Sequence, residues 1–206
     1  MAGDDAVVRR LRDAVSRLDS QTQGRPRTGL GHDDADETAG TVATDDAIGF
    51  DPFPLLAALA GHGARVVVIG QVAGIMHGSR ELTGDLDLLW DGEARQAPAM
   101  AAAFASVAAS LADGDGAPVR CGPAAFSLPK VLFRTALASG DCCTPALPWR
   151  DLAIGQFLSR CLVATAAPGF EIRYLARADL IQMRQAAGRV KDLRRARELG
   201  ALAATT

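Results

Sequence analysis

Two short stretches decide the fold of this chain: Arg65-Val-Val-Val-Ile-Gly70 and Thr83-Gly-Asp-Leu-Asp-Leu-Leu-Trp90. The β-branched run in the first predicts a buried strand, and Gly70 ends it in a turn that leads into a short helix from Val72 to about His77. The second stretch predicts another strand, which ends at the turn pair Asp91-Gly92. Together with the strands and helices expected further along, this order predicts an α/β or α+β domain with a mixed sheet flanked by helices.

The second stretch carries a pair of acidic side chains, Asp85 and Asp87. Residues two apart in a strand share one face, so the two carboxylates lie side by side. Like charges this close repel each other unless a cation bridges them, and carboxylate oxygens suit Mg²⁺ or Mn²⁺. Solvated aspartates on an exposed strand edge would give the same pattern, so the pair alone is a weak signal.

The residues around the pair are of types that bind polyphosphates. Gly70 lets the backbone approach a phosphate closely, and free amides at the start of the following helix favour an anion. Ser79 can donate a hydroxyl, and Arg80 or Lys130 can balance the charge of a polyphosphate. Ser79 and Arg80 are equally typical of an ordinary polar loop. We therefore predict a site for a nucleoside triphosphate and a divalent metal.

A longer pattern points to a known family. The segment Val68-Ile-Gly-Gln-Val-Ala-Gly-Ile-Met-His-Gly-Ser79, followed by Thr83 to Leu89, resembles the signature of the DNA polymerase β-type nucleotidyltransferase superfamily. It is most similar to small bacterial nucleotidyltransferase-like proteins related to toxins of abortive-infection and toxin–antitoxin systems. Their chains often end in a segment similar to Asp179 to Leu193. The resemblance extends over about residues 51 to 200, in the same order along the chain.

The resemblance implies the minimal nucleotidyltransferase fold, with helices at its C-terminal end, and a site of three carboxylates. Asp85 and Asp87 take the first two metal-binding positions, with Mg²⁺ or Mn²⁺ as the cofactor. Asp141 is the candidate for the third, as a ligand or as the base for an incoming hydroxyl. An ordinary aspartate in a Gly-Asp turn is the alternative for Asp141.

The resemblance also implies an activity: transfer of a nucleoside monophosphate from a triphosphate to a hydroxyl of an acceptor. The acceptor would be an RNA, such as tRNA, or a protein, and an antitoxin would be a partner. Arg184 and Lys191 match basic positions of the terminal helices that contact the triphosphate, and Asp192 can pair with a neighbouring arginine. A solvated helix surface explains these three residues as well.

One position departs from the family pattern. The glycine of the turn is usually followed by Gly or Ser, whereas this chain has Gln71. Its side chain could donate its amide to the nucleotide, or it could narrow the site and abolish turnover. The second hypothesis is therefore a catalytically degenerate module that binds nucleotide or a protein partner.

The rest of the chain predicts the domain organisation. We expect an amphipathic helix within residues 1–20, a disordered acidic linker over 21–50 and a nucleotidyltransferase-like domain over 51–202, whose part from 177 is helical. Within that domain the further predicted elements are helices at 52–61, 98–111, 152–159, 179–187 and 189–202, and hairpins that pair 131–137 with 141–144 and 161–165 with 170–175.

Composition excludes several other classes. The 206 residues have a net charge of −2 and contain four cysteines without metal-ligand spacing, so we expect reduced thiols. No apolar run is long enough for a membrane span and no secretion signal is visible, so we expect a cytoplasmic protein without membrane contact. A dinucleotide-binding fold is disfavoured, because Gly70, Gly74 and Gly78 do not form G-x-G-x-x-G.

Overall fold

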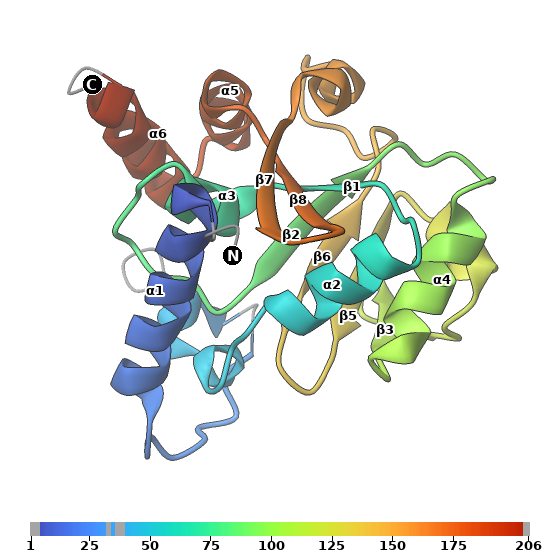
Figure 1. Cartoon of the computed structure of the whole chain (residues 1–206), viewed down its shortest axis with the longest axis horizontal. Helices are drawn as coiled ribbons and strands as arrows, with labels where there is room; N and C mark the ends of the chain where they lie inside the picture. Colours follow the sequence, from blue (N-terminus) through green and yellow to red (C-terminus); the bar gives the residue numbers. More distant parts are fainter. Residues whose placement is uncertain (1–4, 32–33, 36–39, 204–206) are drawn as a thin grey trace.

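The computed structural model describes residues 5–31, 34–35 and 40–203, and these form an eight-stranded mixed sheet flanked by helices (Figure 1). The order of the strands across the sheet is β4-β3-β5-β6-β2-β1-β8-β7. The strands are β1 (Val66–Val68), β2 (Leu86–Trp90), β3 (Ser110–Asp113), β4 (Pro118–Val119), β5 (Lys130–Arg134), β6 (Ser139–Cys143), β7 (Leu162–Ala167) and β8 (Phe170–Tyr174). This architecture confirms the α+β class, with a mixed sheet and C-terminal helices.

The centre of the sheet is the strand β2, which is antiparallel to β1 and parallel to β6. Its side chains Leu86, Leu88 and Leu89 are fully buried and belong to the hydrophobic core. Asp87 is the polar interruption of this apolar strand, and it lies in register with Asp141 of β6. The two strands therefore bring two carboxylates to neighbouring positions.

The helices form two groups around the sheet. They are α1 (Ala6–Thr22), α2 (Phe53–Gly61), α3 (Gly70–Met76), α4 (Ala97–Ser106), α5 (Arg177–Ala187) and α6 (Val190–Ala203). Helix α2 packs on α4, whereas α3 contacts α1 and α5, and α5 packs on α6. Short 3₁₀ segments are η2 (Thr41–Ala43), η3 (Asp45–Ala47), η4 (Pro123–Ser127) and η5 (Ile154–Arg160).

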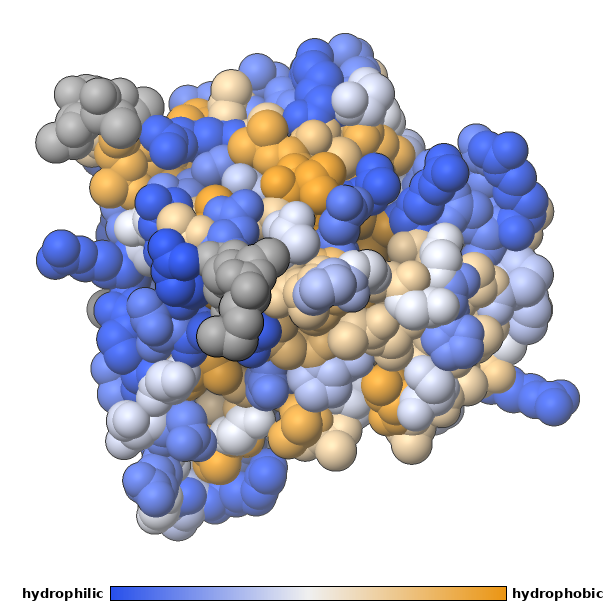
Figure 2. Space-filling view, in the orientation of Figure 1, coloured by the Kyte–Doolittle hydropathy of each residue, from blue (hydrophilic) through white to orange (hydrophobic). Residues whose placement is uncertain are grey.

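Helix α1 is the amphipathic helix expected near the N-terminus. Val8, Leu11 and Leu18 recur at helical spacing and are buried, and the Asp5 carboxylate caps the helix by accepting from the Val7 amide. The outward face of α1 is mostly hydrophilic (Figure 2). The helix is thus packed against the domain, through α3, rather than extending from it.

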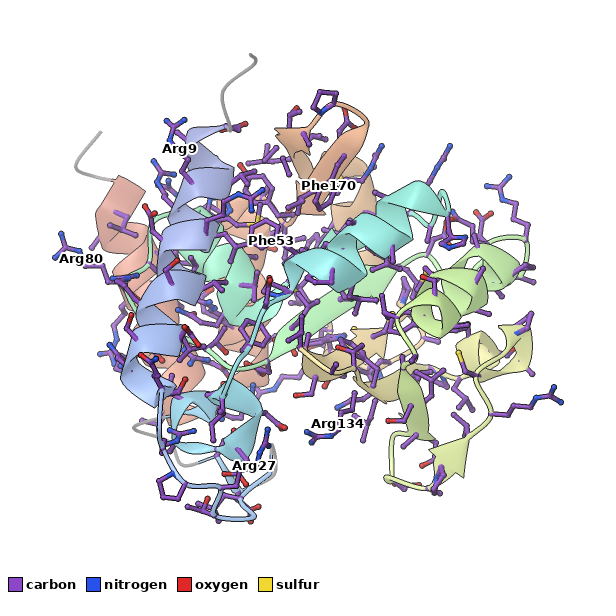
Figure 3. The ribbon with its side chains drawn as sticks, turned by 60° about the horizontal axis from the view of Figure 1, so that its bottom comes forward. Arg9, Arg27, Phe53, Arg80, Arg134 and Phe170 are labelled. Atoms are coloured by element: carbon purple, nitrogen blue, oxygen red, sulfur yellow. The ribbon has the colours of Figure 1, made fainter. Side chains whose placement is uncertain are left out.

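The disordered linker predicted over 21–50 is wrong for residues 40–50, which pack against the domain. Thr41, Thr44, Ala47 and Phe50 are all buried in this segment. Small residues and hydrogen bonds take the place of the missing large apolar side chains. Arg134 of β5, which is labelled in Figure 3, forms an ion pair with the buried Asp46. Residues 32–33 and 36–39 of the predicted linker lie outside the described residues.

Other predicted elements agree with the structure, with two differences. The helix predicted over 98–111 ends at Ser106; Ala108 has a positive φ of 51°, and the chain then turns into β3. The segment predicted as a helix over 152–159 is the 3₁₀ segment η5. Both hairpins form, as β5–β6 and β7–β8. Gly188 separates α5 from α6 in the left-handed conformation that glycine favours.

None of the helices among the described residues is both long enough and apolar enough to cross a membrane.

Candidate functional site

A cleft of about 270 Å³ lies beside β2 and β6, under α5 and α6. Its residues come from segments far apart in the chain, including the η2 segment, the turn before α3 and the loop after β6. The charged and apolar residues among them form three sets. The acidic set is Asp85, Asp87, Asp141 and Asp192, and the basic set is Lys130, Arg184, Arg189, Lys191 and Arg195. The apolar set is Ile69, Leu147, Trp149, Leu180, Met183 and Ala187. The three carboxylates predicted for the site thus line one cleft.

Hydrogen bonds fix Asp85 just before β2. Thr41 Oγ1 donates to Asp85 Oδ1 at 2.9 Å, and the Thr83 hydroxyl donates to the same oxygen. The Gly84 amide donates to Thr41 Oγ1 at 2.9 Å. Thr41 therefore ties the N-terminal segment to the strand that carries the acidic pair.

Asp87 lies in the cleft, close against the backbone of Gly70. Burial raises the pKa of its carboxyl well above the ordinary value, and the neighbouring carboxylates of Asp85 and Asp141 raise it further. Gly70 has a φ of 61°, and a Cβ atom at that position would lie 1.7 Å from Asp87 Oδ2. Only glycine at this turn leaves room for the Asp87 carboxylate.

Lys130 is the cation nearest to the third carboxylate. Its Nζ lies 2.7 Å from Asp141 Oδ2, with 30% of the lysine side chain and 17% of the aspartate side chain exposed. Burial lowers the pKa of Lys130, but Asp141 and Asp87 outweigh this effect and raise it overall. Lys130 therefore stays charged and neutralises part of the acidic set.

Gln71 is anchored inside the protein and does not extend freely into the cleft. Its side chain is 2% exposed, and its amide donates to Ser79 Oγ at 3.0 Å and to the Glu81 carbonyl at 2.7 Å. Its side-chain oxygen accepts from Arg184 Nη2 at 2.7 Å. Gln71 thus connects the turn, the following loop and α5.

Arg184 is a buried cation with spare hydrogen-bonding capacity. It is 4% exposed, and besides Gln71 it donates to the Gly70 carbonyl at 3.1 Å. Its Nη1 has no partner among the described residues. Burial, together with Arg195, lowers its pKa to about 10, so it is still protonated at neutral pH. A buried donor left without a partner is costly, and an anion in the cleft would satisfy it.

The structure separates the predicted phosphate-binding residues into two groups. Gly70, Gln71, Lys130, Arg184 and Lys191 line the cleft.

Ser79 and Arg80 do not belong to the residues that line the cleft, contrary to the sequence expectation. Ser79 Oγ donates to the Glu198 carboxylate of α6 at 2.9 and 3.0 Å. Arg80 is exposed and points outward at the edge of the molecule (Figure 3). Asp192 pairs with Arg189 at 2.6 Å, as expected for a neighbouring arginine.

Several residues of the cleft were not predicted. Thr41 was assigned to the linker, and a Thr in an acidic, glycine-rich stretch gives no signal of a buried partner. Trp149 could have been noticed as a large aromatic residue in the Pro-rich loop after Asp141. Arg195 lines the cleft while its guanidinium binds Glu81 at 2.6 Å, and sequence alone does not show that pairing.

The acidic set has the donor chemistry for a divalent metal, but its present geometry is not a finished metal site. Within the described ranges, no group of three His, Cys, Asp or Glu side chains is arranged to hold a metal ion. Asp85 accepts from two threonines, and Asp141 is paired with Lys130. The pKa of Asp87 is raised first by burial and then by the carboxylates of Asp85 and Asp141, and a cation would relieve the repulsion among these groups. The carboxylates fit a metal in type, with Asp85 and Asp87 as the nearest pair in sequence.

Comparison with known protein families and with curated proteins finds no match for this chain.

Proposed function

We propose that this protein is a metal-dependent nucleotidyltransferase that transfers a nucleoside monophosphate from a triphosphate to a hydroxyl group. The observation that carries the proposal is the register of β2 and β6. It brings Asp87 beside Asp141, with Asp85 two residues away, in a cleft that also contains Arg184 and Lys191. A cluster of carboxylates beside the cations of Arg184 and Lys191 suits a ligand that combines a polyphosphate with a divalent metal.

The roles of the residues follow from their places in the cleft. Asp85 and Asp87 would hold Mg²⁺ or Mn²⁺, and Asp141 would be the third ligand or the base. The metal, when bound, supplies charge neutralisation on the phosphates and polarises the attacking oxygen. Arg184 and Lys191 bind phosphate oxygens of the nucleotide.

The transfer itself is an in-line displacement at the α-phosphorus. The acceptor oxygen forms a bond to this phosphorus, the bond to the β-phosphate bridging oxygen breaks, and pyrophosphate leaves. Asp141 accepts the proton of the acceptor hydroxyl, and Lys130 Nζ lies 2.7 Å from Asp141 Oδ2. The acceptor we propose is an RNA, such as tRNA, or a protein, in the cytoplasm, with an antitoxin as a partner in a toxin-type system.

The test is a transfer assay with each labelled triphosphate, Mg²⁺ or Mn²⁺, and total RNA or protein extract. Wild-type protein is expected to transfer label, and Asp85→Asn/Asp87→Asn is expected to lose transfer. Asp115→Asn, a charge change at an exposed turn residue away from the cleft, is the matched control and should retain transfer. Equal labelling by wild type and the double variant would contradict the proposal.

A second candidate, a module that binds nucleotide without turnover, is favoured by two contacts. Lys130 already neutralises Asp141, and Gln71 is fixed by three hydrogen bonds at a position where the family has a small residue. This candidate predicts nucleotide binding by calorimetry with no transfer from any triphosphate. Transfer that depends on Asp87 would rule it out.

A further inference from the structure

The apolar set of the cleft shows where the flat part of a ligand would bind. Leu147 and Trp149 come from the loop after β6, and Leu180 and Met183 come from α5. We propose that these four side chains form the ring site of the cleft, and that it selects purine nucleotides without distinguishing adenine from guanine. This inference rests on the proposed function, because it names the substrate class of the same site.

The ring site adjoins the phosphate-binding cation on one face of α5. Leu180, Met183 and Arg184 are three and four residues apart, so they lie on the same side of the helix and line the same cleft. A ligand whose ring lies against Leu180 and Met183 therefore has its charged part within reach of Arg184. A nucleotide combines these two parts, whereas inorganic polyphosphate has only one.

The loop that carries Trp149 is held against the junction of α5 and α6. Arg150 has a positive φ of 53°, an uncommon conformation for a residue that is not glycine. Its guanidinium lies over Gly188, where a Cβ atom would be 2.9 Å from Arg150 Nη2. Gly188 thus leaves space for a contact that keeps the neighbouring Trp149 beside α5.

The chemistry of the ring site explains the predicted specificity. Its four side chains are apolar except for the indole N–H of Trp149, which is buried without a partner among the described residues. Stacking on apolar and aromatic surface depends on ring area and tolerates different bases. Discrimination between adenine and guanine needs several placed donors and acceptors, and the four side chains offer one donor. The larger purine ring is therefore favoured over the pyrimidine ring.

The size of the cleft agrees with this ligand class. A volume of about 270 Å³ is close to the lower end of the roughly 300 to 1,000 Å³ range of small-molecule pockets. The carboxylates come from the sheet, the segment just before it and α6, whereas α5 contributes Leu180 and Met183 together with Arg184, so the ring site is the part of the cleft suited to an apolar group.

Tryptophan fluorescence tests the proposal directly, because the chain has two tryptophans and only one lies in the cleft. Trp90 is 1% exposed in the core, so ligand-dependent changes report Trp149. The full chain would be titrated with ATP, GTP, CTP, UTP and inorganic tripolyphosphate in the presence of Mg²⁺, and calorimetry would measure each affinity. ATP and GTP are expected to change the emission and to bind within a few-fold of each other and more tightly than CTP and UTP.

Variants of Trp149 separate stacking from general damage to the fold. Trp149→Ala is expected to weaken ATP binding by roughly 5- to 150-fold, the range of one stacked base, and to leave tripolyphosphate binding unchanged. Trp149→Phe keeps an aromatic ring and should stay within a few-fold of wild type. ATP affinity that is equal in wild type and Trp149→Ala, pyrimidines that bind as well as purines, or no nucleotide binding at all would overturn the proposal. Purine binding that depends on Trp149, without nucleotide transfer, would uphold it and refute only the proposed enzyme.

Discussion

Replacing Asp87 by asparagine is expected to stabilise the metal-free protein at neutral pH. Asp85 and Asp87 are two residues apart, a spacing of about 6.6 Å along a strand. Coulomb's law with an effective dielectric constant of about 20 gives roughly 2.5 kcal/mol of repulsion between their two carboxylates. Asp141 adds repulsion from the neighbouring strand, and Lys130, bound to Asp141, offsets much of that second contribution. The net gain expected for Asp87→Asn is therefore about 2 kcal/mol.

Thermal unfolding in EDTA measures this gain. For a domain of this size, about 2 kcal/mol corresponds to a rise in Tm of roughly 4 to 8 °C. Asp115→Asn removes the same charge from an exposed turn and should leave the Tm within about 1 °C, because exposed substitutions of this kind have small effects. Addition of Mg²⁺ should raise the Tm of wild type but not that of Asp87→Asn. A variant that is no more stable than wild type would refute the reasoning, because it would show that the carboxylates do not destabilise the fold.

Three further predictions concern the same region. Gly70→Ala should lower the free energy of unfolding in urea more than Gly169→Ala does. Both glycines have a positive φ, which costs alanine about 1 to 2 kcal/mol, but only the alanine at position 70 also clashes with Asp87. Equal losses in the two variants would contradict the close contact between Gly70 and Asp87. Thr41→Val should destabilise the protein by about 1 to 3 kcal/mol, because it removes the hydroxyl that donates to Asp85 and accepts from the Gly84 amide. An unchanged midpoint of urea unfolding would disprove that role. Folding raises the pKa of the Asp87 carboxyl above its ordinary value of 3.8. The free energy of unfolding of wild type should therefore fall as the pH rises from 3.8 to the folded-state pKa. Urea unfolding measured across this pH range should show a weaker fall for Asp87→Asn.

The sheet was predictable because its central strands are short apolar runs, and the polar residue Asp87 is the one interruption in β2. Val66–Val68 and Leu86–Trp90 follow the β-branched and leucine-rich pattern of buried strands, and glycines mark the turns between them. Helix ends were less predictable where alanine dominates, since the run after Pro98 has no periodicity that fixes its last turn. There the positive φ of Ala108, which composition does not reveal, accompanies the change to β3.

The candidate site could be predicted only where local pattern and long-range pairing coincide. Asp85 and Asp87 follow from strand periodicity, and Asp141 required an expectation about a strand more than fifty residues later. Ser79 was expected in the cleft as a loop hydroxyl near a glycine turn, but Glu198, more than a hundred residues further along, binds it instead. Sequence pattern gives the face of one element, whereas the partner of a polar side chain depends on tertiary packing.

The position of residues 40–50 has a consequence for how this protein is made. The segment leaves the ribosome early, yet its partners come later: Thr41 binds Asp85, Ala47 packs where the backbone of Gly84 has no Cβ, and Asp46 pairs with Arg134. The last of the three contacts, between Asp46 and Arg134, can form only after another 88 residues have been added beyond Asp46. The wall of the cleft that contains Thr41 is therefore completed only after the central strands have been translated and paired. The carboxylate cluster forms late, and the nascent chain lacks it until then.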